Sequence, residues 1–180
     1  MVKDFSKIGL GEGKFFIDLD ETDEMEIGYV RGGAFNSNLT MRHIEVDGKK
    51  GYVVGDAVYE QELPQIEFVA MQMDASLVTK VFVNTVLTDN TDGTATVKRK
   101  NSNPLAADYH TNVAYVGKTK DGSPIIIKLL NGLGEGPITL EMNDKGEIEI
   151  PALFTGNYAT MAEEHAPFEI SIPYSDSVIA

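Results

Sequence analysis

The sequence predicts a mainly β protein, a sandwich or barrel of about ten strands with one flanking helix. Short segments rich in β-branched and aromatic residues recur along the chain, separated by turn residues. Asp-Gly pairs, which are typical of tight hairpin turns, occur at Asp47-Gly48, Asp92-Gly93 and Asp121-Gly122. Only one stretch has apolar residues with a helical period. The interior is therefore expected to be built from strands.

The clearest hairpin in the first half is predicted at residues 39–59. Leu39–Val46 alternates in polarity, Asp47-Gly48 supplies a turn with positive φ, and Gly51–Tyr59 returns antiparallel to it. Two shorter strands are predicted before this hairpin, and after it comes a segment that is either a strand or the start of a helix. These three segments are Lys14–Leu19, Met25–Val30 and Gln65–Met73.

The predicted helix covers Asp74–Thr88. Asp74 can cap its first turn, and six side chains share one stripe at a 3.6-residue period: Leu77, Val78, Val81, Phe82, Thr85 and Val86. Its β-branched residues favour a strand instead, so a strand-rich interior is the alternative.

The second half is predicted to return to strands. Asn112–Thr119 and Ser123–Leu130 form a hairpin around Asp121-Gly122. Lys100–His110 and Asn131–Gly136 are rich in turn residues and are predicted as loops. The remaining predicted strands are Thr94–Lys98, Pro137–Met142, Gly146–Phe154 and Phe168–Tyr174.

Length and composition exclude several classes of protein. The 180 residues fit a single domain, with no boundary visible between residues 1 and 180. The absence of cysteine excludes disulfides, thiolate metal sites and cysteine nucleophiles. A net charge of −13 argues against a protein that binds nucleic acid by neutralising phosphates. No signal peptide or membrane-spanning segment is visible, so no membrane insertion is expected.

Glycines at positions 9, 11 and 13, followed by Lys14, invite comparison with a phosphate-binding loop. That loop needs four residues between its glycines, then Lys and Ser or Thr, between a strand and a helix. Here three residues separate Gly9 from Gly13, and Phe15 follows the lysine. We therefore interpret this segment as a flexible N-terminal arm or a turn.

No other motif indicates a reaction. Neither the acidic run at residues 18–26 nor Asp89–Gly93 has the spacing of a calcium loop. His43, His110 and His165 are not at metal-ligand spacing, and no nucleophile elbow is present. We expect no catalytic residue, no metal and no cofactor. A hydrolase with a carboxylate pair stays an alternative, because 28 acidic residues do not single out a pair.

Lys98-Arg99-Lys100 is the only basic cluster in the sequence. In a chain this acidic, we favour a solvated loop, since exposed charges are the norm. The alternative is that the cluster pairs with an acidic patch on a neighbouring subunit.

The order of these features resembles the major tail protein, or tail tube protein, of long-tailed bacteriophages. The resemblance covers most of the chain and depends on the order of loosely matching stretches. These are GLGEGKFFIDL, IGYVRGGAF, MRHIEVDGKKGYVVG, EFVAMQMDASLVTKVF, PFEISIP and the segment from VAYVGKTKDG to ALFTGNY.

The resemblance implies a β-sandwich or barrel with one flanking helix that assembles into hexameric rings with a continuous inner β-barrel. The rings stack into a tube around a tape-measure protein, and tail terminator and baseplate or tip proteins are implied at its ends. Genomic DNA would pass through the lumen without specific binding. The implied location is the virion tail, assembled in the cytoplasm of the bacterial host.

Two segments would make subunit contacts if the resemblance holds. They are the N-terminal arm at residues 1–14 and the hairpin at residues 39–59. The implied contact residues are Gly9, Gly11, Gly13, Arg42, Asp47, Gly48, Lys49 and Lys50.

Two other functions remain as alternatives. A tube protein of a contractile injection device would have the same fold and assembly, surrounded by a sheath. A soluble β-sandwich that binds carbohydrate would instead stay small and present a concave aromatic patch.

Overall fold

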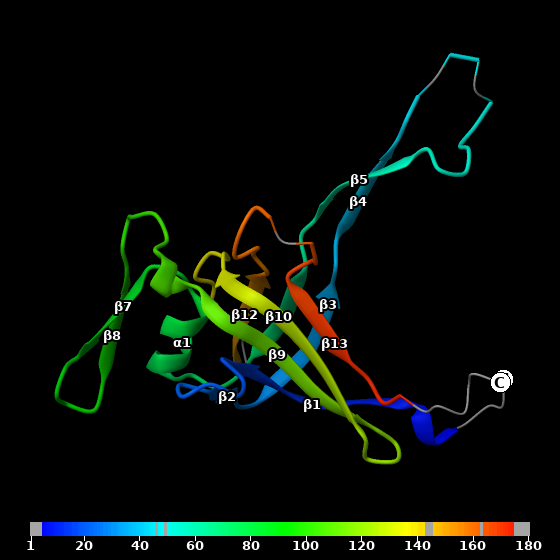
Figure 1. Ribbon diagram of the computed structural model, residues 1–180. Coiled ribbons are helices and arrows are strands. Elements are labelled where there is room, and N and C mark those ends of the chain that lie inside the picture. The colour runs from blue at the N-terminus through cyan, green and yellow to red at the C-terminus, as the bar shows by residue number, and fades with distance from the viewer. Residues whose placement is uncertain (1–4, 46, 49, 143–145, 163, 175–180) are drawn as a thin grey trace.

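The structure is a computed structural model that describes residues 5–45, 47–48, 50–142, 146–162 and 164–174. Two antiparallel sheets pack against each other (Figure 1). The first sheet contains, in spatial order, β2 (Met25–Ile27), β1 (Gly9–Ile17), β9 (His110–Thr119), β10 (Pro124–Gly134) and β13 (Phe168–Ser171). The second contains the end of β10, then β12 (Ile148–Thr155), β6 (Gln65–Ala70) and β3 (Val30–Asn36), with β11 (Glu141–Met142) paired to β12. The predicted mainly β class with one helix is confirmed.

Strand β10 belongs to both sheets. It pairs with β9 and β13 along most of its length, and then Leu133 and Gly134 pair with β12. The change of direction occurs at Asn131, whose φ is 48°. Its side-chain amide donates to the carbonyl of Asn157, while the Asn157 amide donates back to the carbonyl of Asn131, at 2.9 and 3.0 Å. The prediction of a loop at Asn131–Gly136 is therefore wrong for residues 131–134, which continue β10.

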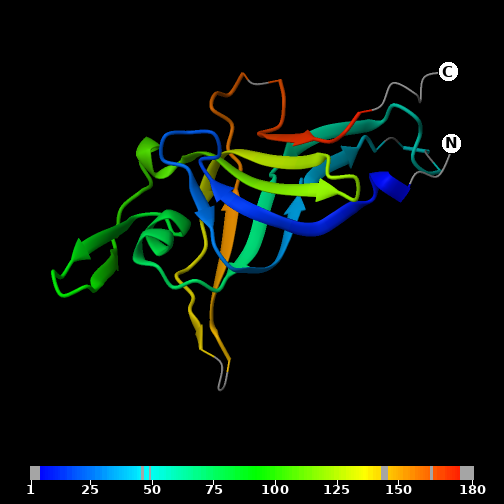
Figure 2. The same cartoon turned by 90° about the horizontal axis from the view of Figure 1, so that it is seen from below.

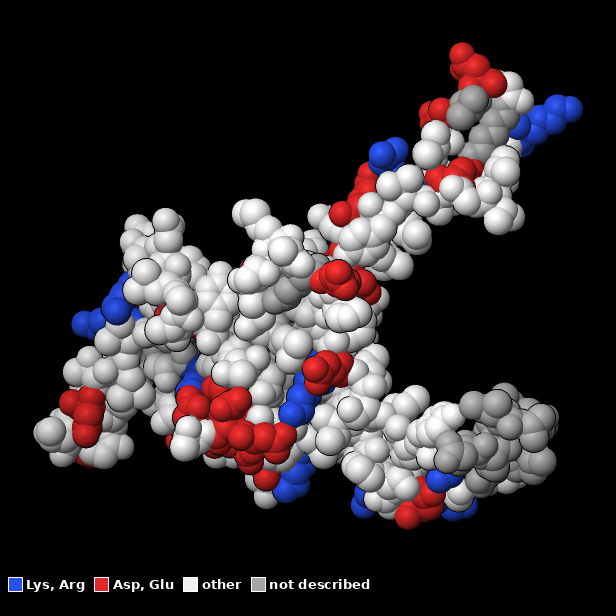
Figure 3. Space-filling model, viewed as in Figure 1, with Lys and Arg blue, Asp and Glu red and all other residues white. Residues whose placement is uncertain are grey.

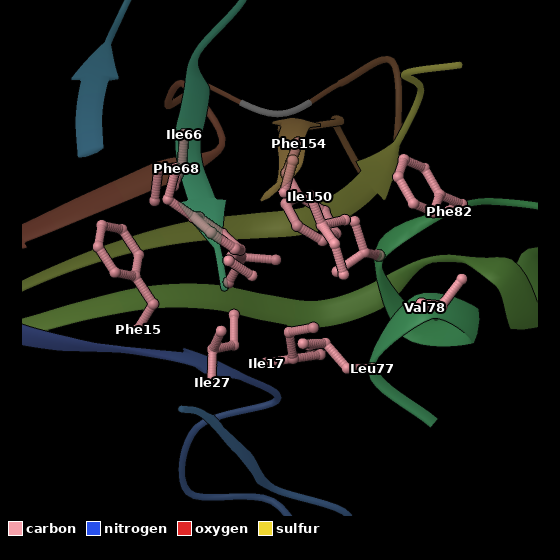
Figure 4. Packing of buried hydrophobic residues seen from close by; sticks show 14 of the residues in the cluster. Phe15, Ile17, Ile27, Ile66, Phe68, Leu77, Val78, Phe82, Ile150 and Phe154 are labelled. Atoms are coloured by element: carbon pink, nitrogen blue, oxygen red, sulfur yellow. The ribbon is translucent and has the colours of Figure 1, made fainter. Parts of the chain in front are cut away.

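The hydrophobic core lies between the two sheets and is closed at one end by the helix (Figure 4). Phe15 from the first sheet contacts Phe68 from the second, with ring centroids 4.8 Å apart. Phe68 in turn stacks near Phe154 at 6.0 Å. The other large buried side chains include Ile17, Ile27, Ile66, Leu77, Val81, Phe82, Leu129 and Ile150.

The helix is shorter than predicted. Helix α1 covers Ala75–Val81, and Asp74 caps it as expected by accepting hydrogen bonds from the backbone of Ser76 and Leu77. Beyond Val81 the backbone turns away, and Val83 N–H donates to the carbonyl of Gly134 at 3.2 Å. Thr85–Asp89 then forms strand β7, because the β-branched residues there suit a strand that pairs with β8 (Ala95–Arg99).

Three further hairpins are present; the one formed by β9 and β10 was predicted, whereas β7–β8 was not, because its first strand was predicted as the end of the helix. β9 and β10 are joined by Asp121-Gly122, with Gly122 at a φ of +86° as a hairpin turn requires. Figure 2 shows hairpins β7–β8 and β11–β12 projecting from the body in different directions. The predicted loop at Lys100–His110 contains one turn of 3-10 helix, η2 (Ala106–Asp108), and its last residue begins β9.

The N-terminal segment was predicted as a flexible arm or a turn, but from Gly9 onward it is a strand. Residues Gly9–Ile17 form β1, which lies between β2 and β9 and carries the buried side chains of Phe15 and Ile17. Before it, the 3-10 turn η1 (Phe5–Lys7) packs on the β9–β10 turn, where the backbone N–H groups of Lys120 and Asp121 donate to Ile8 and Ser6. A deletion through Lys14 would therefore remove most of a central strand.

Gly134 is required where the end of α1 meets β10. A Cβ atom at this position would lie 1.9 Å from the backbone oxygen of Val81. We expect Gly134→Ala to lower the free energy of unfolding by about 1–3 kcal/mol, because one of the two backbones must move. Urea unfolding followed by circular dichroism measures this. Gly136→Ala is the matched control, since nothing lies within 4 Å of its Cβ position; equal stability of both variants would contradict the prediction.

Candidate assembly surfaces

The most prominent feature of the surface is a long two-stranded projection. Strands β4 (Leu39–His43) and β5 (Ala57–Glu62) pair only with each other and extend the β3–β6 hairpin away from the body (Figure 1). We call residues Leu39–Glu62 the arm. Its base is fixed by Asn38, at a φ of 50°, whose amide donates to the carbonyl of Leu63 and to the side chain of Gln65, both at 3.0 Å.

The arm confirms the predicted hairpin but changes its turn. The strands end at His43 and resume at Ala57, so a long loop replaces the predicted two-residue turn. Gly48 does have positive φ, at +84°, as expected of the Asp47-Gly48 pair. A register shift between Thr40 and Met41 also breaks the simple alternation that the sequence predicts for β4.

Contacts near the ends of the two strands hold the described part of the arm loop in shape. Asp56 contacts His43 Nδ1 at 2.6 Å through one carboxylate oxygen and accepts from the Val53 N–H at 2.8 Å through the other. The His43 ring stacks on Tyr52, with centroids 3.8 Å apart. The side chains of Tyr52, Val53 and Val54 in this loop are exposed to solvent, and that of Val54 is fully exposed. We call these three residues the arm tip. Adjacent exposed apolar side chains of this kind mark interaction surfaces.

The predicted contact residues fall into two separate places. Arg42 lies on β4 and pairs with Glu60 across the arm at 3.3 Å. Asp47, Gly48 and Lys50 lie in the arm loop and are exposed, whereas Lys49 lies outside the described residues. The glycines at positions 9, 11 and 13 lie far from the arm in sequence, in strand β1.

The glycines of β1 border an open cleft between the sheets. The cleft has a volume of about 330 Å³ and is lined by Gly11, Gly13, Phe15 and Tyr115 from one sheet and by Gly32, Gly33 and Phe35 from the other. The ring of Tyr115 covers Gly13, where a Cβ atom would lie 2.4 Å from it. This glycine is therefore needed for packing between strands, and sequence spacing did not reveal that role.

A buried polar cluster joins β1, α1 and β9, and it was not predicted. The Asp18 carboxylate accepts from the Thr111 N–H at 2.8 Å and contacts Lys80 Nζ at 3.3 Å and His110 Nδ1 at 3.1 Å. His110 Nε2 lies 2.7 Å from the Lys80 carbonyl. Lys80 also reaches Asp23 at 2.9 Å.

The charges of this cluster stabilise one another. Burial lowers the pKa of Lys80, but its hydrogen bonds to Asp23 and Asp18 outweigh that effect and hold the pKa above 10.5. The hydrogen bond from Lys80 likewise holds the pKa of Asp23 below 3.8. Among the described residues, every buried side-chain nitrogen or oxygen atom has a hydrogen-bond partner, those of this cluster included. We interpret the cluster as a structural clasp.

A second charged contact fixes the residues before β1. Asp121, in the β9–β10 turn, accepts from the Thr119 hydroxyl and pairs with Lys7 at 2.9 Å. These hydrogen bonds, with that from Thr119 the strongest, hold the pKa of Asp121 far below its ordinary range. The described start of the chain is thus docked on its own subunit.

Among the residues that the structure describes, no group of three or more His, Asp and Glu side chains is arranged to hold a metal ion. The helices within the same residues are all too short or too polar to span a bilayer.

No family model and no curated protein matches the chain. The chain is similar to several solved structures, among them the following two. One is from the tail of an empty GTA particle with C6 symmetry, at 12% identity and a TM-score of 0.43, covering 90% of this chain and 96% of that one. The other is from the six-fold symmetrised baseplate of the anti-feeding prophage, at 13% identity and a TM-score of 0.43, covering 86% and 91%.

Proposed function

We propose that the chain is a structural protein of a bacteriophage tail, and more narrowly the tail tube subunit of a long-tailed phage. In this proposal it polymerises as stacked hexameric rings that form the conduit for DNA ejection. The observation that supports it most is the arm, which leaves the body and, among the described residues, exposes the apolar side chains of Val53 and Val54. A monomeric protein gains nothing from such a projection, whereas an assembling subunit can bury it on a neighbour.

The edges of the sheets also support assembly. Among the described residues, β2 and β3 are edge strands, and β13 pairs only with β10. Ile170 and Ile172, in and after β13, are exposed beside that edge. An unpaired strand edge with apolar side chains is a ready template for pairing with another chain. Ring formation would cover them, with head-to-tail contacts closing the ring.

The proposed partners follow from the tube. They are other copies of the chain, a tape-measure protein inside, and terminator and baseplate or tip proteins at the ends. Genomic DNA would pass without being bound. A net charge of −13 for each subunit is compatible with a lumen that repels phosphates. The place of action would be the virion tail, after assembly in the host cytoplasm.

The tube of a contractile injection device would use the same subunit architecture. Electron microscopy of the particle distinguishes the two, because only the contractile system has a sheath around the tube. A carbohydrate-binding module would be distinguished by a protein that stays small and binds carbohydrate instead of polymerising.

The arm tip provides the direct test of assembly. We expect the double variant Val53→Ser and Val54→Ser to raise the critical concentration for polymerisation at least about tenfold, since each buried valine contributes about 1.5–3 kcal/mol. Sedimentation and negative-stain microscopy measure tube formation. The unfolding midpoint is expected to stay unchanged, because Val54 is fully exposed and Val53 largely so.

Leu105→Ser is the matched control, because Leu105 is also an exposed apolar residue but lies outside the arm. It is expected to polymerise like the wild type. Tubes of the double variant at the wild-type concentration would refute the role of the arm tip. A wild-type protein that stays monomeric at all concentrations and salt conditions would refute the tube itself.

A further inference from the structure

A groove lies at the base of the arm, between β5 and the segment that precedes β13. Its volume is about 850 Å³. Tyr59 and Leu63 line one side, and Tyr158 and Met161 line the other. The hydroxyl groups of Tyr59 and Tyr158 lie 3.1 Å apart and join the two sides. We call this feature the basal groove.

The basal groove combines apolar surface with acidic side chains. Met161 is fully exposed, and Tyr59 and Leu63 are about half exposed, at 51% and 45%. Glu60, Glu62 and Glu164 add three carboxylates to the lining. Glu60 pairs with Arg42, but among the described residues no cation lies within ion-pair distance of Glu62 or Glu164. The groove is therefore suited to an occupant that is both apolar and basic.

The β7–β8 hairpin of the same chain has this combination. Val86 and Lys98 lie directly opposite each other across the two strands, so their side chains share one face. Lys100 follows two residues after Lys98. Within the described part of the chain, neither lysine forms an ion pair. Arg99 points elsewhere, toward the carbonyl of Gly136 at 3.4 Å.

The hairpin and the groove lie on different sides of one subunit. In Figures 1 and 2, hairpin β7–β8 projects from the end of the body near α1, away from the base of the arm. Figure 3 shows Lys and Arg side chains over one part of that hairpin, Asp and Glu side chains at its far end, and Asp and Glu side chains near the base of the arm. The lysine-bearing part of the hairpin and the groove therefore have complementary charge, but the two can meet only between copies.

We propose that the basal groove of one copy binds the β7–β8 hairpin of a second copy. Lys98 and Lys100 would face Glu62 and Glu164, while Val86 would contact the apolar side chains of Leu63 and Met161. Because the two surfaces differ and lie on different sides, the contact is head-to-tail and can close a ring. This proposal rests on the self-assembly proposed above and assigns it a specific contact.

The two parts of the contact contribute differently. Exposed ion pairs add little affinity, but they align partners and exclude wrong ones. The apolar side chains supply most of the binding free energy. Assembly that uses this contact is therefore expected to weaken with added salt, because exposed charges are screened within about 8 Å at physiological ionic strength.

Charge exchange between the two surfaces tests the proposal. One variant carries Lys98→Glu and Lys100→Glu, and the other carries Glu62→Lys and Glu164→Lys. Each alone is expected to raise the critical concentration for assembly at least about tenfold, because like charges then face each other. An equimolar mixture of the two variants is expected to assemble near the wild-type concentration, since every hairpin then meets a groove of opposite charge.

The mixture is its own control, because it contains the same substitutions as the two failing samples. A chain that carries all four substitutions is expected to assemble alone. If wild-type tubes form and both variants assemble as well as the wild type, the contact is wrong while the tube proposal survives. If each variant fails and neither the mixture nor the fourfold variant recovers, the contact is also refuted. A wild-type protein that never assembles refutes both proposals.

Discussion

Phe154→Ala is expected to lower the free energy of unfolding by about 3–5 kcal/mol, the usual cost of removing a fully buried aromatic side chain. Phe154 is completely buried on β12. Its ring centroid lies 6.0 Å from that of Phe68 in the core (Figure 4). On another side it lies 5.9 Å from the ring of His110, which belongs to the polar cluster. Collapse of the surroundings into the cavity is limited, because strands on both sides hold β12 in place.

Urea unfolding of the variant and the wild type measures this loss. Phe5→Ala serves as the control, because Phe5 is 67% exposed and is expected to change stability by less than about 0.5 kcal/mol. A loss below about 1 kcal/mol for Phe154→Ala would mean that the two sheets do not pack around this residue.

Asp18→Asn is expected to lower the free energy of unfolding by about 3 kcal/mol, as for other buried charge pairs that lose one partner. The Asp18 side chain is only 5% exposed and contacts Thr111, Lys80 and His110. An amide has one acceptor oxygen instead of two, so it cannot satisfy all three of these groups. The variant should also loosen the junction between α1 and the ends of β1 and β9.

Asp23→Asn is the matched control for this prediction. Asp23 contacts the same Lys80 ammonium, but its side chain is 67% exposed. Asp23→Asn is expected to lower the free energy of unfolding by less than about 1 kcal/mol, because exposed ion pairs contribute little to stability. Equal losses for the two variants, measured by urea unfolding, would show that the clasp is no more than a surface ion pair.

Local sequence patterns were sufficient to predict two of the hairpins. The Asp121-Gly122 turn, flanked by β-branched residues, correctly placed β9 next to β10. The arm was correctly expected near Leu39, because a long alternating segment precedes Asp47-Gly48. Both predictions depend on contacts between residues close in sequence, where turn chemistry decides the pairing.

Local patterns failed where tertiary contacts decide. The apolar stripe from Leu77 to Val86 was predicted as one helix, but α1 ends at Val81 because the following chain reaches the carbonyl of Gly134. The segment Gly9–Gly13 was predicted as a flexible N-terminal arm or a turn. It is instead part of β1 and pairs with β9 beside the ring of Tyr115. The glycine-rich strand β3 was not predicted as a separate strand, since glycines weaken the β signal.

The candidate surfaces divide in the same way. The arm and the basic cluster are each continuous in sequence, so the resemblance could imply the arm as a contact segment, and the cluster could be named as an alternative contact. The basal groove and the Asp18 clasp could not be, because their residues come from segments about 90 to 100 positions apart. Only folding brings Tyr59 to Tyr158 and Asp18 to His110.

The sequence by itself determined a cysteine-free, acidic, mainly β chain with one capped helix and a long hairpin. These properties follow from composition, residue periodicity and turn residues, which act over a few positions. Only the tertiary structure decided that β10 joins two sheets, that the first glycines form a strand, and which charges face one another. Those outcomes depend on packing and pairing between distant segments, and their energies have no signature in a short stretch of sequence.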